Sequence, residues 1–357
     1  MRYLVLTLCV LMLLTAPVFA QEDIGIETQA LTEELDAEAS ELLPSYEQVQ
    51  SRSFWDVLQS MLFGSVSKAN GEFKSALRLC ATLLSIVTLF AVTSFSAEKY
   101  NTVAMIAGAL AIAAAMLGSV QSMVHLARDT MDRMQSYSAC FLPILASTTV
   151  MSGGIQSGSV LYGGTVLFSQ LLMRLIGSLL IPMVYVYLAV ATAESATDNK
   201  MLKEIREFIG WLISKSLRII VYVYIGYISV TGVISGSADA LTVKTTKAAL
   251  SGMVPVVGGI VSDASESLLA SAALLKSSVG TFGMLAVLAI CIVPFLKVGV
   301  HYLLLKLTAA VSGAVGCTSH VTLLKRFSEA MGYLLGMCGA YALMLLISSV
   351  CFLRVVL

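Results

Sequence analysis

Charged side chains are scarce in this sequence, which excludes an ordinary soluble protein. Only 12% of its 357 residues are Asp, Glu, Lys or Arg, whereas about 25% are charged in typical soluble domains. Hydrophobic residues make up 57% of the chain, and its mean hydropathy is +0.87. Repeated long apolar runs predict an all-α polytopic membrane protein. The formal net charge is zero, so the overall charge says little about partners.

Motifs on which common enzyme mechanisms depend are also missing. No Walker-type phosphate loop occurs, because neither Gly153-Gly154 nor Gly258-Gly259 is followed by the Lys-Ser/Thr pair that a nucleotide loop needs. The sequence has no Gly-x-Ser-x-Gly elbow and no His-Glu-x-x-His pair, and its three histidines have no triad context. Basic clusters are too small for nucleic-acid binding. We therefore expect neither an enzyme, nor a cofactor site, nor a nucleic-acid-binding protein.

The seven cysteines indicate neither a disulfide framework nor a metal site. Cysteine in an apolar run acts as a small hydrophobic residue, and this holds for Cys9, Cys80, Cys140, Cys291, Cys338 and Cys351. Cys317 and His320 form the one close Cys/His pair of the sequence, and a single pair cannot supply the four ligands of a zinc site. No bound metal is therefore expected.

Residues 1–20 have the pattern of a secretory signal peptide. Arg2 precedes an apolar core from Leu4 to Leu14, and Val18-Phe19-Ala20 resembles a cleavage site. The alternative is an uncleaved first membrane helix, although the apolar core is short for a span of roughly 20 residues. Either interpretation puts the following segment outside the cytoplasm.

Residues 21–75 are predicted to form an acidic extracytoplasmic lead with an amphipathic helix. Nine Asp or Glu residues and no Lys or Arg occur between Gln21 and Gln50, which favours a solvated, partly helical arm over a partner-docking motif. Apolar residues then recur with helical spacing from Phe54 to Leu62. This helix is expected to lie along the membrane surface or, alternatively, against a partner.

Residues 76–124 are predicted to form a transmembrane hairpin of two spans separated by a short polar turn. Residues 139–193 are also apolar, but they are interrupted by Pro143, Ser152-Gly153-Gly154, Gly163-Gly164 and Pro182. They therefore fit either three short spans or a re-entrant hairpin plus a longer span. Thr197–Arg218 has the pattern of an amphipathic interfacial helix, and the positive-inside rule places it in the cytoplasm. With later runs up to a last span at Met331–Leu353, about 6–10 membrane segments are expected.

Two pairs of prolines indicate an internal duplication. Pro143 and Pro182 are 39 residues apart, as are Pro255 and Pro294, and the two pairs are offset by 112 positions. Proline-interrupted segments at corresponding positions of two repeats are the best sequence indication of a substrate or ion site in transporter folds. The alternative is that these prolines only kink helices at packing contacts.

Each proline pair is followed by a basic segment, at residues 202–208 in the first block and 321–327 in the second, and then by an apolar span. We therefore predict a membrane repeat 1 over residues 139–235 and a membrane repeat 2 over residues 251–353. If both basic segments are cytoplasmic, each repeat contains an even number of crossings, and the two copies run parallel rather than inverted.

A polar block, from Gly236 to Leu285, places small, polar and charged residues between apolar segments. Polar backbone survives at membrane depth only where it is buried in protein or lines a watery cavity, so the block suggests a pathway or an assembly surface. Its charged residues can pair in a cavity or decorate an exposed loop, and a loop is favoured for Asp239, Lys244 and Lys247. The candidate pathway or assembly residues are Pro143, Pro182, Lys244, Lys247, Pro255, Asp263, Glu266, Lys276 and Pro294.

The polar block also carries a family resemblance. Its segments 242–247, 253–258, 262–264 and 271–276 closely resemble the stage III sporulation protein AE family of endospore-forming bacteria. The likeness extends over most of the chain and includes the leader, the acidic lead and the first proline pair. One departure from the family pattern is the short extracytoplasmic region before Ala76.

The resemblance implies a component of the mother-cell membrane around the forespore, within a channel or secretion-like complex that joins the two cells. The partners it implies are other membrane proteins of the same stage III sporulation operon and a forespore partner protein, besides the lipid bilayer and further copies of the chain. No substrate and no catalytic residue follow from it. Two functions stay open: a permease-like or channel subunit that lines a route, and a structural scaffold whose small-residue helices bind partner subunits.

Overall fold

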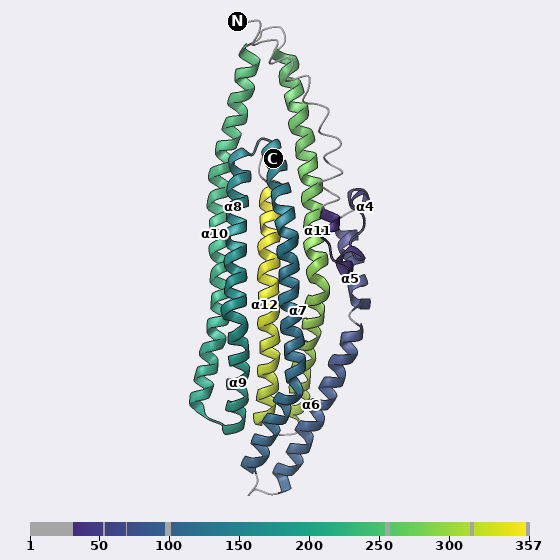
Figure 1. Ribbon diagram of the computed structural model, residues 1–357, viewed down its shortest axis with the longest axis vertical. Coiled ribbons are helices and arrows are strands. Elements are labelled where there is room, and N and C mark those ends of the chain that lie inside the picture. Colours follow the sequence, from purple (N-terminus) through teal and green to yellow (C-terminus); the bar gives the residue numbers. More distant parts are fainter. Residues whose placement is uncertain are drawn as a thin grey trace.

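The computed structural model is an elongated bundle of antiparallel helices (Figure 1). It describes residues 31–52, 54–68, 70–96, 101–253, 258–314 and 318–354, and every regular element in these ranges is a helix. The elements are α3 (Ala37–Ser40), α4 (Tyr46–Ser51), α5 (Phe54–Lys68), α6 (Asn70–Ser96), α7 (Asn101–Met151), α8 (Ile155–Leu175), the π-helical turn η2 (Ile176–Leu180), α9 (Ile181–Thr197), α10 (Lys200–Met253), α11 (Gly258–Gly313) and α12 (Thr318–Arg354).

Six helical stretches in the described part of the chain are long and apolar enough to cross a membrane. A hydrocarbon core of about 30 Å needs roughly 20 helical residues, and the shortest of the six stretches has 23. They lie in α6, α7, α8–α9, α10, α11 and α12. The prediction of an all-α polytopic membrane protein is therefore confirmed. The signal peptide predicted at residues 1–20 lies outside the described residues.

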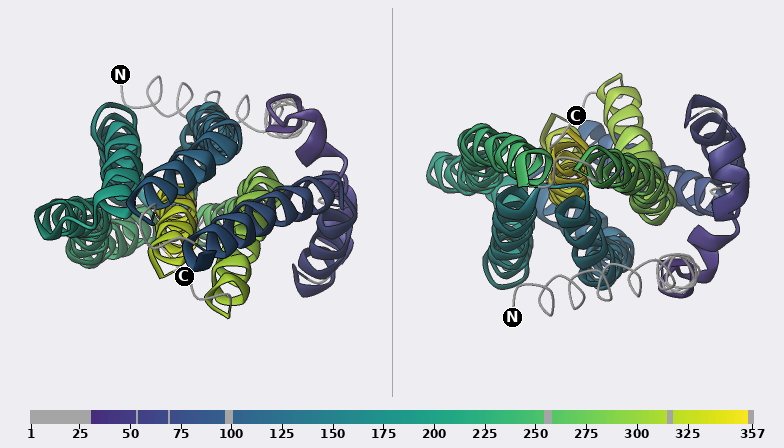
Figure 2. Two further views of the ribbon diagram at one scale, coloured as in Figure 1. Left: turned by 90° about the horizontal axis from the view of Figure 1, so that it is seen from below. Right: turned by 90° about the horizontal axis from the view of Figure 1, so that it is seen from above.

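The last helix, α12, lies at the centre of the bundle, where the views along its axis show it surrounded by the others (Figure 2). It contacts α7, α8, α9, α10 and α11. Its inward-facing side chains are fully buried, among them Leu334, Tyr341 and Leu345. Helices α3 to α6 lie at the periphery. The second predicted repeat thus supplies the core helix against which the first repeat packs.

The long helices alternate in direction along the chain (Figure 1). The ends of α6, α9 and α11 therefore lie at one end of the bundle with the starts of α7, α10 and α12. Basic segment 202–208 lies near the start of α10, and segment 321–327 lies near the start of α12. Both segments are at the same end of the bundle, as parallel repeats require, while the duplication itself stays a prediction.

The first proline of repeat 1 does not break a helix, contrary to the prediction of short spans or a re-entrant hairpin within residues 139–193. Helix α7 continues from the first hairpin through Pro143 to Met151, because neighbouring helices and polar side chains in a membrane bundle can compensate for the hydrogen bond that proline loses. The chain turns instead at Gly153, whose φ of 97° is a conformation that only glycine adopts easily. The Gly153-Gly154 interruption is therefore a turn.

Pro182 is also accommodated inside a helical rod rather than at a break. It is the second residue of α9 and directly follows the π-helical turn η2. The Ile181 N–H bonds to the Ile176 carbonyl, five residues earlier, so the hydrogen-bond register changes next to the residue that lacks a donor. As a result α8, η2 and α9 form one continuous helical rod. The third short span that was predicted within residues 139–193 is absent from this described stretch.

The polar block is helical wherever the structure describes it, so the loop predicted at Asp239, Lys244 and Lys247 is wrong. These residues belong to α10, and Asp263, Glu266 and Lys276 belong to α11. Residues 237–253 contain no proline and a single glycine among Ala, Leu and Lys, which favours helix. The end of α10 and the start of α11 project beyond α7, α8 and α12 (Figure 1). Pro255 lies outside the described residues.

The described part of the acidic lead packs on the bundle, so the predicted solvated arm is wrong there. Asp36 forms an ion pair with Arg133 of α7, and Glu38 lies 3.1 Å from Lys297 of α11. In α5, Val57 and Met61 are fully buried, whereas Trp55 is 72% exposed. Helix α5 therefore covers α11 with one face and leaves an apolar face free. That this free face lies on the membrane surface stays a prediction.

Candidate functional site at the repeat interface

Two clusters of polar side chains lie where α12 of the second repeat meets α8, α9 and α10 of the first. The charged cluster, near the end that carries both basic segments, begins with Arg206 of α10. Its side chain is only 2% exposed, and its Nε donates to Oε2 of Glu194 in α9 at 2.5 Å. A second donor, Nη2, lies 3.3 Å from Oε1 of Glu207. The guanidinium is therefore held between carboxylates, as a buried charge requires.

Helix α12 completes the charged cluster with Arg326 and Glu329. Arg326 Nη1 lies 2.9 Å from Oε1 of Glu329, and the Tyr187 hydroxyl of α9 donates to the same carboxylate. The rings of Tyr187 and Tyr333 meet edge to face with centroids 5.3 Å apart. The charged cluster thus receives Arg206 from segment 202–208 and Arg326 from segment 321–327. These are the two basic segments at corresponding places in the predicted repeats.

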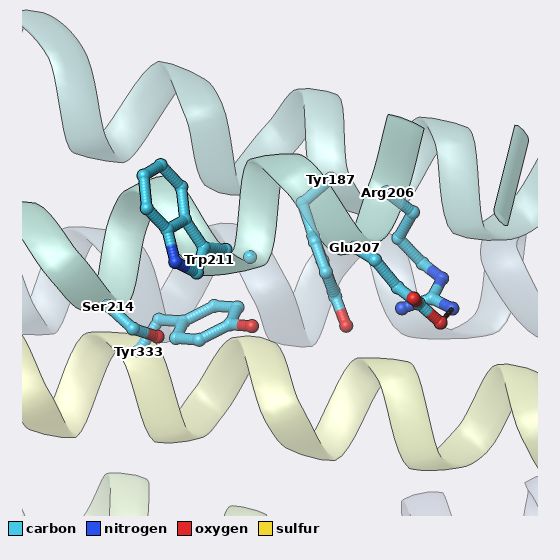
Figure 3. Close-up of a pocket in the computed structure, with 7 residues that line it drawn as sticks. Tyr187, Arg206, Glu207, Trp211, Ser214 and Tyr333 are labelled. Carbon is cyan, nitrogen blue, oxygen red and sulfur yellow. Dashed lines mark hydrogen bonds and ion pairs between the residues drawn. The ribbon is translucent and has the colours of Figure 1, made fainter. Parts of the chain in front are cut away.

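A recess of about 260 Å³ adjoins the charged cluster (Figure 3). Its lining residues come from α9, α10 and α12 and are Tyr187, Arg206, Glu207, Gly210, Trp211, Ser214 and Tyr333. Gly210 leaves space for the Tyr333 hydroxyl, because a Cβ at this position would lie 2.6 Å from that oxygen and the tyrosine would have to shift. The recess combines donors, acceptors and aromatic faces, so it can hold a small polar group beside the buried guanidinium.

The hydroxyl cluster lies further along the same interface and joins α8, α10 and α12. Thr165 Oγ1 lies 3.0 Å from Ser348 Oγ and 3.2 Å from the Tyr224 hydroxyl, and Tyr224 also bonds to Ser348. The Ser169 and Tyr341 hydroxyls form a further pair at 2.6 Å. All five side chains are buried. Within lipid, such groups must find partners inside the bundle, and here they bond across the two repeats.

The structure does not bring the three predicted prolines that it describes to this interface. Pro143 and Pro182 lie on the exposed side of α7 and α9, while Pro294 is buried within α11. Lys244 and Lys247 belong to α10, and Asp263, Glu266 and Lys276 belong to α11, but the structure does not describe their side chains, and Pro255 is outside the described residues. The three described prolines therefore form no joint site with the two polar clusters.

Sequence reasoning missed the residues of both clusters. Arg206 and Arg326 belong to the two basic segments that the sequence pointed to. Segment 202–208, however, was predicted to be part of an interfacial helix, and no buried contact was predicted for it. The hydroxyl cluster had no usable signal, because Ser, Thr and Tyr residues occur throughout the apolar runs.

Comparison with known proteins agrees with the family resemblance of the sequence. The model of the family described as stage III sporulation protein AE matches residues 41–354. A relative, stage III sporulation protein AE of Bacillus subtilis (strain 168), is 24% identical over 295 residues, which cover 82% of this chain and 72% of the relative. No solved structure matches. Because the family match covers most of the chain, including both polar clusters, the chain belongs to the stage III sporulation protein AE family.

Proposed function

We propose that this chain is a multi-pass subunit of the channel or secretion-like complex that joins mother cell and forespore, and that it acts there as a permease-like or channel subunit. Its place would be the mother-cell membrane around the forespore. Its partners would be the other membrane proteins of the stage III sporulation operon and a forespore partner protein. Family membership and six candidate spans support a membrane role in sporulation.

The observation that carries a transport role is the pair of polar clusters at the repeat interface. Buried polar and ionisable groups are costly within a membrane bundle and usually mark a route or a site. In many transporters, the site lies between two structural repeats that move against each other. Here the hydroxyls of Thr165, Tyr224 and Ser348 bond directly to one another. This arrangement corresponds to a closed interface, and separating α12 from α8 and α10 would open it.

The projecting part of α10 and α11 fits the same proposal. It extends the chain beyond the other helices at the end opposite the basic segments (Figure 1). By the positive-inside rule this is the extracytoplasmic end, where the chain would meet components from the other cell. Asp263, Glu266 and Lys276 belong to the first third of α11, so they remain candidates for pathway or assembly residues.

A structural scaffold is the second candidate function, and one observation favours it. Each hydroxyl of the hydroxyl cluster already has a partner within the chain. A fully satisfied polar network makes a bundle rigid and specifies one arrangement of its helices. In a scaffold, the interface would stay closed, and the protein would serve only to hold its partners.

Single substitutions in the polar block distinguish the two functions. Asp263→Asn, Glu266→Gln and Lys276→Gln would each be tested in sporulating cells for assembly of the complex and, separately, for passage of a small reporter into the forespore. Intact assembly with lost passage supports a route, and lost assembly supports the scaffold. Lys306→Gln is the matched control, because it removes a charge from the same helix at an exposed position outside the block. If neither assembly nor passage changes, these charges have no role in either function.

A further inference from the structure

Three glycines on α12 are not explained by the packing of the chain itself. A Cβ on Gly332, Gly336 or Gly339 would come no closer than 3.4, 3.7 or 3.6 Å to any neighbouring side chain, which is ordinary contact. A Cβ on Gly210, in contrast, would lie only 2.6 Å from the Tyr333 hydroxyl oxygen. Glycine inside a helix costs up to about 1 kcal/mol relative to alanine. Alanine would therefore fit α12 better, unless something outside the chain approaches these positions closely.

These glycines line an apolar groove of about 500 Å³ between α10, α11 and α12. Its walls include Leu217, Tyr222, Phe295 and Leu343. Three of these side chains are exposed, namely Tyr222, Phe295 and Leu343. The groove lies within three candidate membrane spans and opens at the surface of the bundle. Its occupant therefore comes from the membrane.

Arg218 of α10 also lines the groove and supplies the one charged side chain of its lining. It is exposed and forms no ion pair with any residue that the structure describes. An arginine on the outer face of a membrane span is costly unless it finds a counter-charge or reaches the interface. The groove thus offers a small-residue surface next to a positive charge that has no ion-pair partner in the described part of the chain.

We propose that this groove binds a transmembrane helix of another subunit, one that has small residues on its contact face and a carboxylate that pairs with Arg218. This inference rests on the proposed membership of a membrane complex. Gly332, Gly336 and Ala340 follow one another at four-residue spacing on α12, and such spacing lets a second helix approach closely. A second copy facing the first about a twofold axis at the groove would bring two unpaired Arg218 side chains together. Charge therefore favours a different, acidic partner.

The test uses the full chain, co-expressed in turn with each membrane protein of the same operon and purified in mild detergent. Gly336→Leu fills the groove, and Arg218→Glu reverses its charge. Each is expected to lower recovery of one specific partner about tenfold. Gly226→Leu is the matched control, because Gly226 of α10 has open space around it and does not line the groove. Replacing the partner's intramembrane carboxylate by Lys should restore recovery with Arg218→Glu.

Other outcomes overturn the inference in distinguishable ways. If recovery of every partner is unchanged in both variants, the groove is not a helix site, although the proposed function stands. Loss of self-association alone would identify a second copy as the occupant, and loss of co-purified phospholipid alone would identify a lipid. If the unsubstituted chain recovers no partner at all, the proposed membership of the complex fails as well. The thermal unfolding temperature of Gly336→Leu is measured as a control. If it equals that of the wild type, misfolding is excluded as the cause of lost partner recovery.

Discussion

Arg206→Met is expected to destabilise the protein strongly, because it leaves a carboxylate without its partner. The Arg206 side chain is 2% exposed and that of Glu194 is 13% exposed, so both charges are largely removed from water. Methionine keeps much of the apolar stem but supplies no donor. Removing one member of a buried ion pair typically costs about 3–5 kcal/mol. We expect about 3 kcal/mol in the free energy of unfolding, since residual exposure of Glu194 lets water relieve part of the cost.

The double variant Arg206→Met/Glu194→Leu separates the ion pair from the packing of the stem. It removes both charges, and apolar replacements of a buried pair are often neutral. Its cost should be below about 1 kcal/mol, which corresponds to a coupling of at least about 2 kcal/mol between the two positions. A small cost for the double variant would mean that the pair specifies the arrangement of the helices more than it stabilises them.

The assay is reversible unfolding of the purified chain in mixed detergent micelles, followed by helical circular dichroism. Arg218→Met serves as the control, because this arginine is exposed and has no ion-pair partner among the described residues. Its effect should stay within about 0.5 kcal/mol. The reasoning is refuted if Arg206→Met costs less than about 1 kcal/mol, or if the double variant is as unstable as the single one.

Two further predictions rest on named contacts, and a third rests on the direction of the repeats. Tyr224→Phe removes one hydroxyl of the hydroxyl cluster and should cost about 1 kcal/mol of unfolding free energy, and no loss would mean that the cluster is not structural. The hydrogen bond to Lys68 lowers the pKa of Glu41 from its ordinary value of 4.5. Glu41→Gln should therefore be slightly less stable than the wild type at pH 7, and this difference in stability should disappear as the pH falls through the lowered pKa. A difference in stability that stays constant with pH would contradict this prediction. Reporter tags inserted after Lys203 and Lys325 should report the same side of the membrane, and opposite sides would exclude parallel repeats.

Membrane segments were the most predictable part of the fold. Apolar runs at residues 76–95 and 102–124 stand out because lipid excludes charge, and α6 and the first half of α7 occupy them. Gly153-Gly154 was also recognised as an interruption, since few residues adopt the φ that the turn requires. Composition and turn chemistry act locally, so they are visible in one sequence.

Helix continuity was predicted less well, because it depends on neighbours that are distant in sequence. Pro143 and Pro182 have the local chemistry of breaks, yet α7 continues through the first and a π-helical turn precedes the second. The polar block was assigned to a loop at Lys244 and Lys247 because its polarity was taken as a sign of irregular backbone, whereas its helix-forming residues form the ends of two long helices.

The polar clusters at the repeat interface could not be predicted from one sequence. Thr165 and Ser348 are 183 residues apart, and their hydroxyls meet only because α12 packs against α8. Arg206 looked like one of several basic residues on an interfacial helix, although it is among the most buried large side chains of the protein. Burial of a charge is set by tertiary packing, which periodicity alone does not show.

Locking the repeat interface tests the proposed route most directly. The hydroxyl oxygens of Thr165 and Ser348 are 3.0 Å apart, so Thr165→Cys/Ser348→Cys would place two thiols within reach of a short bis-methanethiosulfonate cross-linker. This reagent forms a disulfide with each thiol, releases a methanesulfinate each time, and so joins α8 to α12. Each single cysteine variant, treated in the same way, is the control. If the interface opens for transport, the cross-linked complex assembles normally, loses passage of the small reporter, and regains it when a cleavable linker is reduced. Unchanged passage through a fully cross-linked complex would contradict a route at this interface.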